Sequence, residues 1–269
     1  MISSLEGPVY ARLQHLHLRK RKEAARRLCC NGCMLTRFRQ TAAELGAVNT
    51  AWYVLARALG LIGCSLQRYL FLAQRVAPQA MRRTAGSIVV RGLMSLDELP
   101  PAYPRPVHVV AARFRQGGCS IAAWKGQELA GILWYQLGAY QEDEVRARYC
   151  LPSPASCWDY DVFVQPQLRL GTAFCRLWDE AHLRMRARGI RWSCSRISAF
   201  NPASLRAHRR IGTVLLGSAS FITAGRWQLM LASRPPYVHL SCSAASCPKL
   251  VFDTAALEQK EFPTCPATC

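Results

Sequence analysis

The chain has 269 residues, about half of them apolar, and its 35 Lys and Arg residues against 16 Asp and Glu residues give a formal net charge of +19. This much apolar surface excludes a disordered or low-complexity protein, because burying it offsets the entropy lost on folding. The length fits a core domain of roughly 150 residues with appendages.

The positive charge is concentrated toward the N-terminus. Residues 1–85 carry +11, residues 86–236 carry +9 and residues 237–269 carry −1. A basic balance favours polyanion partners, and residues 1–85 are the candidate contact with nucleic acid or an anionic membrane surface. However, 30 of the 35 basic residues are Arg. A GC-rich coding bias would also produce this excess, so both explanations stay open.

Two helices are predicted in the first third of the chain. Residues 10–28 read as a basic helix, and a second helical stretch is predicted from about Thr41 to Val76. Its central part, residues 47–66, is apolar enough to raise the question of a membrane span. Arg57 in the middle of that stretch would cost about 2.5–3.5 kcal/mol at the centre of a bilayer. A buried or surface-docked helix is therefore expected.

The thirteen cysteines predict reduced thiols and no metal site. Their number is odd and their spacings are irregular, and Cys29, Cys30 and Cys33 form the one tight cluster. A tetrahedral zinc site needs four ligands, and no second C-x-x-C pair lies nearby. Residues 1–27 lack the apolar segment of a secretory signal. A cytoplasmic protein is expected.

After residue 86 the pattern becomes that of a mixed α/β domain. A proline-rich linker over 100–106 is followed by a helical turn or strand over 107–116, and the strand–helix–strand run after residue 159 predicts two parallel strands. The divisions expected are a basic helical extension (1–85), a core domain (86–236) and a tail (237–269). The remaining predicted elements are strands over 87–91, 119–124, 129–137, 159–164, 191–198, 221–223 and 226–232, and helices over 171–188 and from Asn201 to Gly212.

Two segments of this domain carry a recognisable pattern. Val164–Ala173 reads VQPQLRLGTA, and Asn201–Gly212 reads NPASLRAHRRIG. The first resembles the acyl-CoA-binding loop of the GNAT superfamily of N-acyltransferases, and the second resembles that family's N-x-x-S-x-x-x-[Y/H]-x-x-x-G signature. The resemblance covers roughly residues 87–233. One departure is that Leu168 stands three residues before the first glycine, where the family has Arg or Gln.

The resemblance implies a centrally splayed mixed sheet flanked by helices, with acetyl-CoA as the acyl donor. A helix N-terminus supplies free N–H groups and a partial positive charge for a pyrophosphate. Arg206, Arg209 and Arg210 would either neutralise the CoA 3′-phosphate or form a solvated helix face. The residues expected to hold the donor are Val164, Arg169, Gly171, Thr172, Ala173, Asn201 and Ser204.

Three residues are candidates for proton transfer. His208 stands where the family often has a tyrosine acid, and it is the expected proton donor to the leaving thiolate, although an exposed helix histidine or a CoA contact is an equal alternative. Asp159 and Asp161 lie two apart on a strand, so they are expected to share a face opposite Tyr160. Paired carboxylates would raise the pKa of one of them, as a general base requires.

The neighbouring residues offer candidates for an acceptor site. Glu142, Asp143 and Glu144 form either a solvated loop or the lining of a pocket that attracts a cationic amine. Trp134, Tyr135, Tyr140 and Trp158 are expected mostly in the core, with one or two as walls of that site.

The sequence thus predicts an N-acetyltransferase that transfers an acetyl or other acyl group to an amine in a ternary complex. The acceptor, a small-molecule or protein amine, and the oligomeric state are not identified by the sequence. The alternative is a non-catalytic, CoA-responsive binding or regulatory module whose basic region contacts nucleic acid or a membrane surface.

Overall fold

The computed structural model divides the chain into two compact units, Met1–Ala51 and Trp52–Cys269. Their boundary falls within helix α3 (Ala47–Leu61). Within the described part of the chain, no helix is long and apolar enough to cross a membrane. The helix predicted over residues 10–28 and the Cys29–Cys33 cluster lie outside the described residues. Those are residues 42–78, 87–168, 172–243 and 245–258.

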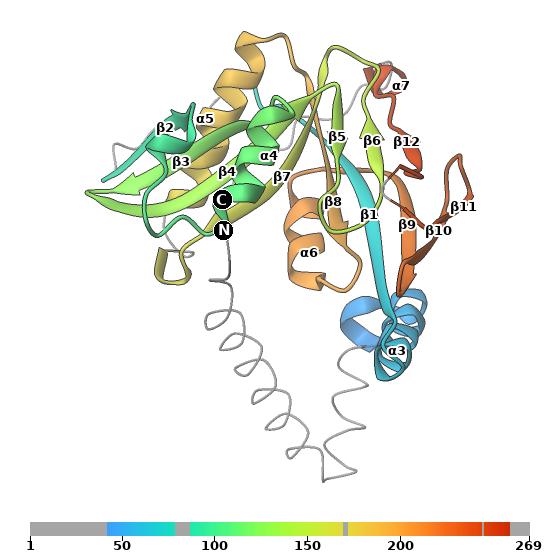
Figure 1. Cartoon of the computed structure of the whole chain (residues 1–269). Coiled ribbons are helices and arrows are strands. Elements are labelled where there is room, and N and C mark those ends of the chain that lie inside the picture. Colours follow the sequence, from blue (N-terminus) through green and yellow to red (C-terminus); the bar gives the residue numbers. More distant parts are fainter. Residues whose placement is uncertain (1–41, 79–86, 169–171, 244, 259–269) are drawn as a thin grey trace. The chain divides into compact units, whose positions relative to one another are not determined.

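A nine-stranded mixed sheet forms the centre of the second unit, with strand order β11-β10-β9-β1-β8-β7-β4-β3-β2 (Figure 1). All neighbouring strands are antiparallel except β7 and β8, which are parallel. This mixed sheet with flanking helices confirms the predicted fold class. The strands are β1 (Ser65–Arg75), β2 (Ile88–Leu93), β3 (Cys119–Lys125), β4 (Glu128–Leu137), β7 (Ser156–Val164), β8 (Trp192–Ser198), β9 (Val214–Ala224), β10 (Trp227–Ala232) and β11 (Val238–Ser241).

The prediction of one helix from Thr41 to Val76 is wrong over its second half. Helix α3 ends at Leu61, Gly63 turns the chain with a φ of 77°, and β1 then runs between β8 and β9. Because β1 is covered on both faces of the sheet, its residues lack the strict alternation of a half-buried strand. The sheet therefore extends to the N-terminal side of residue 86, the predicted start of the core domain.

The predicted strand–helix–strand unit is confirmed as β7, α5 (Ala173–Ala187) and β8. Helix α5 packs on β2, β3 and β4 (Figure 1). Gly189, with a φ of 73°, follows the helix as predicted. The buried side chains of α5 recur at helical spacing, which fixes its inner face: Ala173, Leu177, Trp178, Ala181 and Met185.

The opposite face of the sheet is covered by helix α4 (Val107–Arg115) and a three-stranded sheet of order β12-β6-β5. That sheet consists of β5 (Ala139–Gln141), β6 (Arg148–Cys150) and β12 (Lys249–Val251). Large aromatic side chains fill the space beneath, and Tyr149 and Trp158 lie 4.6 Å apart between ring centroids. Strands β11 and β12 come from residues 237–269, so the predicted tail contributes to both sheets.

The remaining predicted elements are present, and most of their ends shift by at most three residues, but β9 begins at Val214, seven residues before the predicted start at residue 221. Strands β3 and β4 form the expected hairpin, and β9 and β10 pair around the Ala224–Gly225 turn. The segment predicted as a helical turn or strand is helix α4. The other short elements are η1 (Leu96–Glu98), η2 (Pro166–Leu168), α6 (Pro202–Arg210) and α7 (Ala255–Glu258).

Candidate functional site

The parallel strands β7 and β8 separate after three residues. Their pairing runs from Ser156 opposite Trp192 to Trp158 opposite Cys194 and then stops. Beyond that point β7 stays paired with β4 and β8 stays paired with β1 (Figure 1). The sheet is therefore splayed at its centre, as predicted, and it opens toward the C-terminal ends of the two parallel strands, where open α/β sheets bind ligands.

The predicted donor loop follows the C-terminal end of β7. Val164 is buried and pairs with Gly131 of β4, and Thr172 occupies the position before α5. Among the described residues at this helix start, the Thr172 side chain makes no capping hydrogen bond to α5. Ala173 is buried beneath the helix against the sheet, so its side chain packs in the core instead of lining a phosphate site. Arg169 and Gly171 lie outside the described residues.

The second motif forms α6 as predicted. The Asn201 side-chain oxygen accepts a hydrogen bond from the Ser204 backbone N–H at 3.1 Å, which caps the helix, and Pro202 occupies its first turn. The Nδ1 atom of His208 lies 2.7 Å from the Ser204 carbonyl oxygen. Because a carbonyl only accepts, Nδ1 carries the hydrogen and Nε2 is an acceptor in the neutral ring. Burial lowers the pKa of His208 despite this hydrogen bond.

Asp159 stands at the vertex of the opening. It is the first residue of β7 beyond the pairing with β8, and it is only 4% exposed. The Ser193 hydroxyl of β8 donates a hydrogen bond to its carboxylate at 2.7 Å. Burial raises the pKa of Asp159 to about 7, and the Ser193 hydrogen bond opposes that rise. A carboxyl group with this pKa can accept a proton near neutral pH.

The prediction that Asp159 and Asp161 share a face is wrong. Asp161 has a φ of 55°, and the register between β4 and β7 shifts beside it, so the alternation of side chains is broken. Its carboxylate pairs with Arg105 and Arg113, and the Arg113 guanidinium lies over the Tyr160 ring. Asp161 therefore lies on the side of Tyr160, and burial, not Asp161, is what raises the pKa of Asp159.

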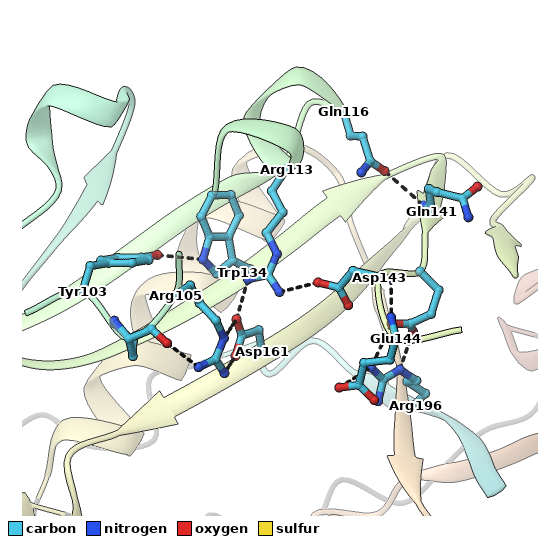
Figure 2. Close-up of polar contacts among 12 residues, drawn as sticks. Tyr103, Arg105, Arg113, Gln116, Trp134, Gln141, Asp143, Glu144, Asp161 and Arg196 are labelled. Carbon is cyan, nitrogen blue, oxygen red and sulfur yellow. Dashed lines mark hydrogen bonds and ion pairs between the residues drawn. The ribbon is translucent and has the colours of Figure 1, made fainter. Parts of the chain in front are cut away.

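The acidic loop between β5 and β6 is tied to both diverging strands (Figure 2). Asp143 pairs with Arg113 at 2.8 Å, and Arg113 in turn pairs with Asp161 of β7. Glu142 is buried and pairs with Arg196 of β8, which also lies 3.1 Å from Glu144. The loop is therefore not simply solvated. We call the following seven residues the ion-pair network: Arg105, Arg113, Glu142, Asp143, Glu144, Asp161 and Arg196.

The electrostatics of this network are nearly balanced. Four carboxylates face three guanidiniums, which leaves one formal negative charge. Burial raises the pKa of Glu142, although Arg196 opposes that rise. Burial would also raise the pKa of Asp143, but Arg113 and its other hydrogen bonds hold it below the usual value. Asp143 and Glu144 are exposed, so this excess negative charge lies at the surface.

Sequence reasoning placed the four aromatic residues correctly but missed the arginines. Trp134, Tyr135, Tyr140 and Trp158 are all buried in the two cores. Arg196 was detectable, because alternation in β8 places it on the same face as the buried Trp192 and Cys194.

Arg113 was also detectable, since it follows the core residue Val110 by three positions on α4. Arg105 and Ser193 had no signal in the sequence. Among the described residues, no group of three His, Cys, Asp or Glu side chains could hold a metal ion.

No family model and no curated protein matches the sequence. Solved structures resemble its fold. A protein of unknown function from Staphylococcus epidermidis matches with a TM-score of 0.41 at 10% identity, over 63% of this chain and 65% of that one. A putative acetyltransferase of the GNAT family from Novosphingobium aromaticivorans matches with a TM-score of 0.39 at 15% identity, over 59% and 63%.

A GCN5-related N-acetyltransferase from Sphaerobacter thermophilus matches with a TM-score of 0.39 at 13% identity, over 65% of this chain and 55% of that one. In all three comparisons this chain spans less than two thirds of the other protein. GNAT acetyltransferases are thus among the solved structures to which this chain is similar in fold.

Proposed function

We propose that this protein is an N-acyltransferase that moves an acetyl or other acyl group from acyl-CoA to an amine within a ternary complex. The observation that carries the proposal is the separation of β7 and β8 directly after Trp158 and Cys194, with the buried Asp159 at the vertex. The opening leads from the start of α5 to a carboxyl group suited to proton transfer. A binding module without catalysis would need the opening but not that carboxyl group.

The donor would bind along β7 and across the start of α5. Arg169, Gly171 and the backbone amides at Thr172 and Ala173 would hold the pyrophosphate, because a helix N-terminus carries free N–H groups and a partial positive charge. The pantetheine arm would pass Val164 and lie between the strands. The side-chain oxygen of Asn201 accepts the capping hydrogen bond of α6. Its amide nitrogen would therefore face the pantetheine arm, with Ser204 beside it.

The transfer needs one proton acceptor and one proton donor. The neutral nitrogen of the acceptor amine forms a bond to the thioester carbonyl carbon, and Asp159, directly or through one water, would take the proton that this nitrogen loses as the amide forms. The carbon–sulfur bond breaks, and the CoA thiolate leaves with the electron pair. His208 would give that thiolate a proton from Nε2, so the products are an amide and free CoA.

This assignment predicts an unusual pH dependence. Asp159 acts as a base only above its pKa of about 7, whereas burial lowers the pKa of His208 below 6.5. Ionised Asp159 together with protonated His208 is therefore a minor population at every pH, and kcat/KM should peak between the two pKa values. His208→Gln should abolish the alkaline fall and leave a curve that rises to a plateau above about pH 7. An alkaline fall that persists in this variant would exclude His208 as the donor.

The acceptor would approach from the face of the ion-pair network and reach Asp159, on the other face of the sheet, through the opening between β7 and β8. Asp143 and Glu144 are exposed there, Glu144 with 54% of its side chain, and the network holds one excess negative charge. These features favour an acceptor that carries a positive charge, either a small molecule or a protein amine. Arg105 stands at the same edge and would limit how closely that cation approaches Asp161.

Titration calorimetry with acetyl-CoA tests the donor site. Wild-type protein should bind saturably, and Gly171→Glu should abolish binding through bulk and like-charge repulsion. Gly60→Glu is the matched control, because it adds the same charge on α3 at a glycine whose side chain would meet no other atom within 4 Å. No binding by folded wild-type protein, or equal binding by both variants, would contradict the proposal.

Turnover is tested by incubating the protein with acetyl-CoA and mixed amines and searching for mass increases. The mass shift gives the acyl group and the labelled species gives the acceptor. Binding of acetyl-CoA without turnover of any amine would instead support the non-catalytic module.

A further inference from the structure

A concave site lies at the opposite end of β7 from the opening. The C-terminal half of α4 faces the ends of β4, β5 and β6 across a cavity of about 570 Å³, a volume typical of small-molecule sites. Two residues of its wall, Gln136 and Leu137, pair with Trp158 and Cys157 of β7. Those positions belong to the end of β7 that is still joined to β8. The cavity is therefore separate from the proposed acyl-transfer site.

The charge of this cavity is positive and uncompensated. Arg115 and Arg148 both line it, both are exposed, and no acidic side chain lines it with them. Within the described ranges neither arginine forms an ion pair, whereas Arg113, two residues before Arg115, pairs with two carboxylates. Two guanidiniums at one cavity repel each other, and an anion between them removes that repulsion. Guanidinium groups bind phosphate and carboxylate through paired hydrogen bonds.

Side-chain amides complete the lining. The Gln116 side-chain oxygen accepts a hydrogen bond from the Gln141 backbone N–H at 3.1 Å, which joins α4 to β5 at the rim (Figure 2). Gln136 is the most buried lining residue, at 4% exposed, and its Nε2 donates to the Ala139 carbonyl. Its Oε1 has no hydrogen-bond partner among the described residues. A buried amide oxygen in that state is unfavourable.

We propose that this cavity binds a small anionic molecule, with a phosphate or carboxylate group between Arg115 and Arg148. The proposal goes beyond acyl transfer and does not depend on it. Binding would hold α4 against β5. The same helix contributes Arg113 to the ion-pair network, and the loop after β5 contributes Asp143. A bound anion would thus stabilise the contact between these two elements.

The test is calorimetric titration of the full-length protein with inorganic phosphate and, separately, with citrate, at constant ionic strength. At least one probe should saturate at one site. Arg115→Gln and Arg148→Gln should each weaken its affinity by about tenfold, and the double variant should abolish binding. Arg91→Gln is the matched control, because Arg91 is exposed on β2 and stacks on Trp124 away from the cavity. It should bind as the wild type does.

Three outcomes would overturn the proposal. Neither probe saturates, or the double variant binds as tightly as the wild type, or binding is lost in Gly171→Glu but kept in the double variant, which would place the anion at the donor loop. The two arginines are exposed and form no ion pair in the described part of the chain, so their replacement should leave the thermal unfolding temperature unchanged. Measuring that temperature for each variant separates loss of the site from loss of the fold. Which probe saturates distinguishes a phosphate ligand from a carboxylate ligand.

Discussion

Two carboxylates of one strand, Asp159 and Asp161, occupy opposite environments. Asp159 is buried with a single neutral partner, the hydroxyl of Ser193, and burial raises its pKa to about 7. Asp161 lies on the other face of the sheet and is held by the guanidiniums of Arg105 and Arg113. The left-handed backbone at Asp161 separates the two. One strand thereby presents a proton acceptor at the vertex of the opening and an anchor for the ion-pair network.

Removing the guanidinium of Arg113, which pairs with both Asp143 and Asp161, should have the largest effect on the free energy of unfolding. Arg113→Ala leaves Asp143 without its arginine and Asp161 with Arg105 alone, so we expect the free energy of unfolding to fall by about 3 kcal/mol or more. Urea denaturation measures this change. Arg115 on the same helix forms no ion pair with the residues that the structure describes, so Arg115→Ala should change stability by less than about 0.5 kcal/mol. Equal losses in the two variants would mean that the network does not stabilise the fold.

Neutralising Asp159 should change how the free energy of unfolding depends on pH. Because the folded protein keeps a proton on Asp159 up to about pH 7, whereas an unfolded chain releases it near pH 4, stability falls as pH rises between those values. We expect the wild type to lose on the order of 2–3 kcal/mol between pH 5 and pH 8.5 through this group.

Asp159→Asn should abolish that loss and so be the more stable protein at pH 8.5. Urea denaturation at both pH values checks the prediction, and Asp97→Asn, an exposed residue of η1, provides the control. A wild-type loss that persists in Asp159→Asn would show that Asp159 is ionised at a lower pH than its burial implies.

The smallest expected effect concerns the Ser193 hydroxyl, which reduces the difference between the two environments. Ser193→Ala removes the hydrogen bond that opposes the raised pKa of Asp159. That pKa should therefore rise by about one more unit. The carboxyl resonance of Asp159, followed by NMR during a pH titration, reports the change whether or not the protein is active. Ser195→Ala, two residues along β8, should leave the titration unchanged, and equal curves for all three proteins would rule out this role for Ser193.

Much of the fold was predictable because its signals are local. The hairpin of β3 and β4, the parallel pair around α5 and the start of α6 follow from turns, caps and periodicity within short windows. Strand β1 was missed because a strand covered on both faces resembles a buried helix in its apolar content. Its neighbours in the sheet, β8 and β9, lie more than a hundred residues further along the chain.

By itself the sequence determined most elements of residues 87–232 and the candidate residues, including the Asn201 cap, the helix after the donor loop and the presence of Asp159 and Asp161 near a strand end. Only the tertiary structure decided what those carboxylates face. The contacts of Arg113 with Asp161, Glu142 with Arg196, and Tyr69 with Glu144 join residues 48, 54 and 75 positions apart. Burial, which sets the pKa of Asp159, likewise depends on the whole packed sheet, whereas a cap or a turn depends on a few neighbouring residues.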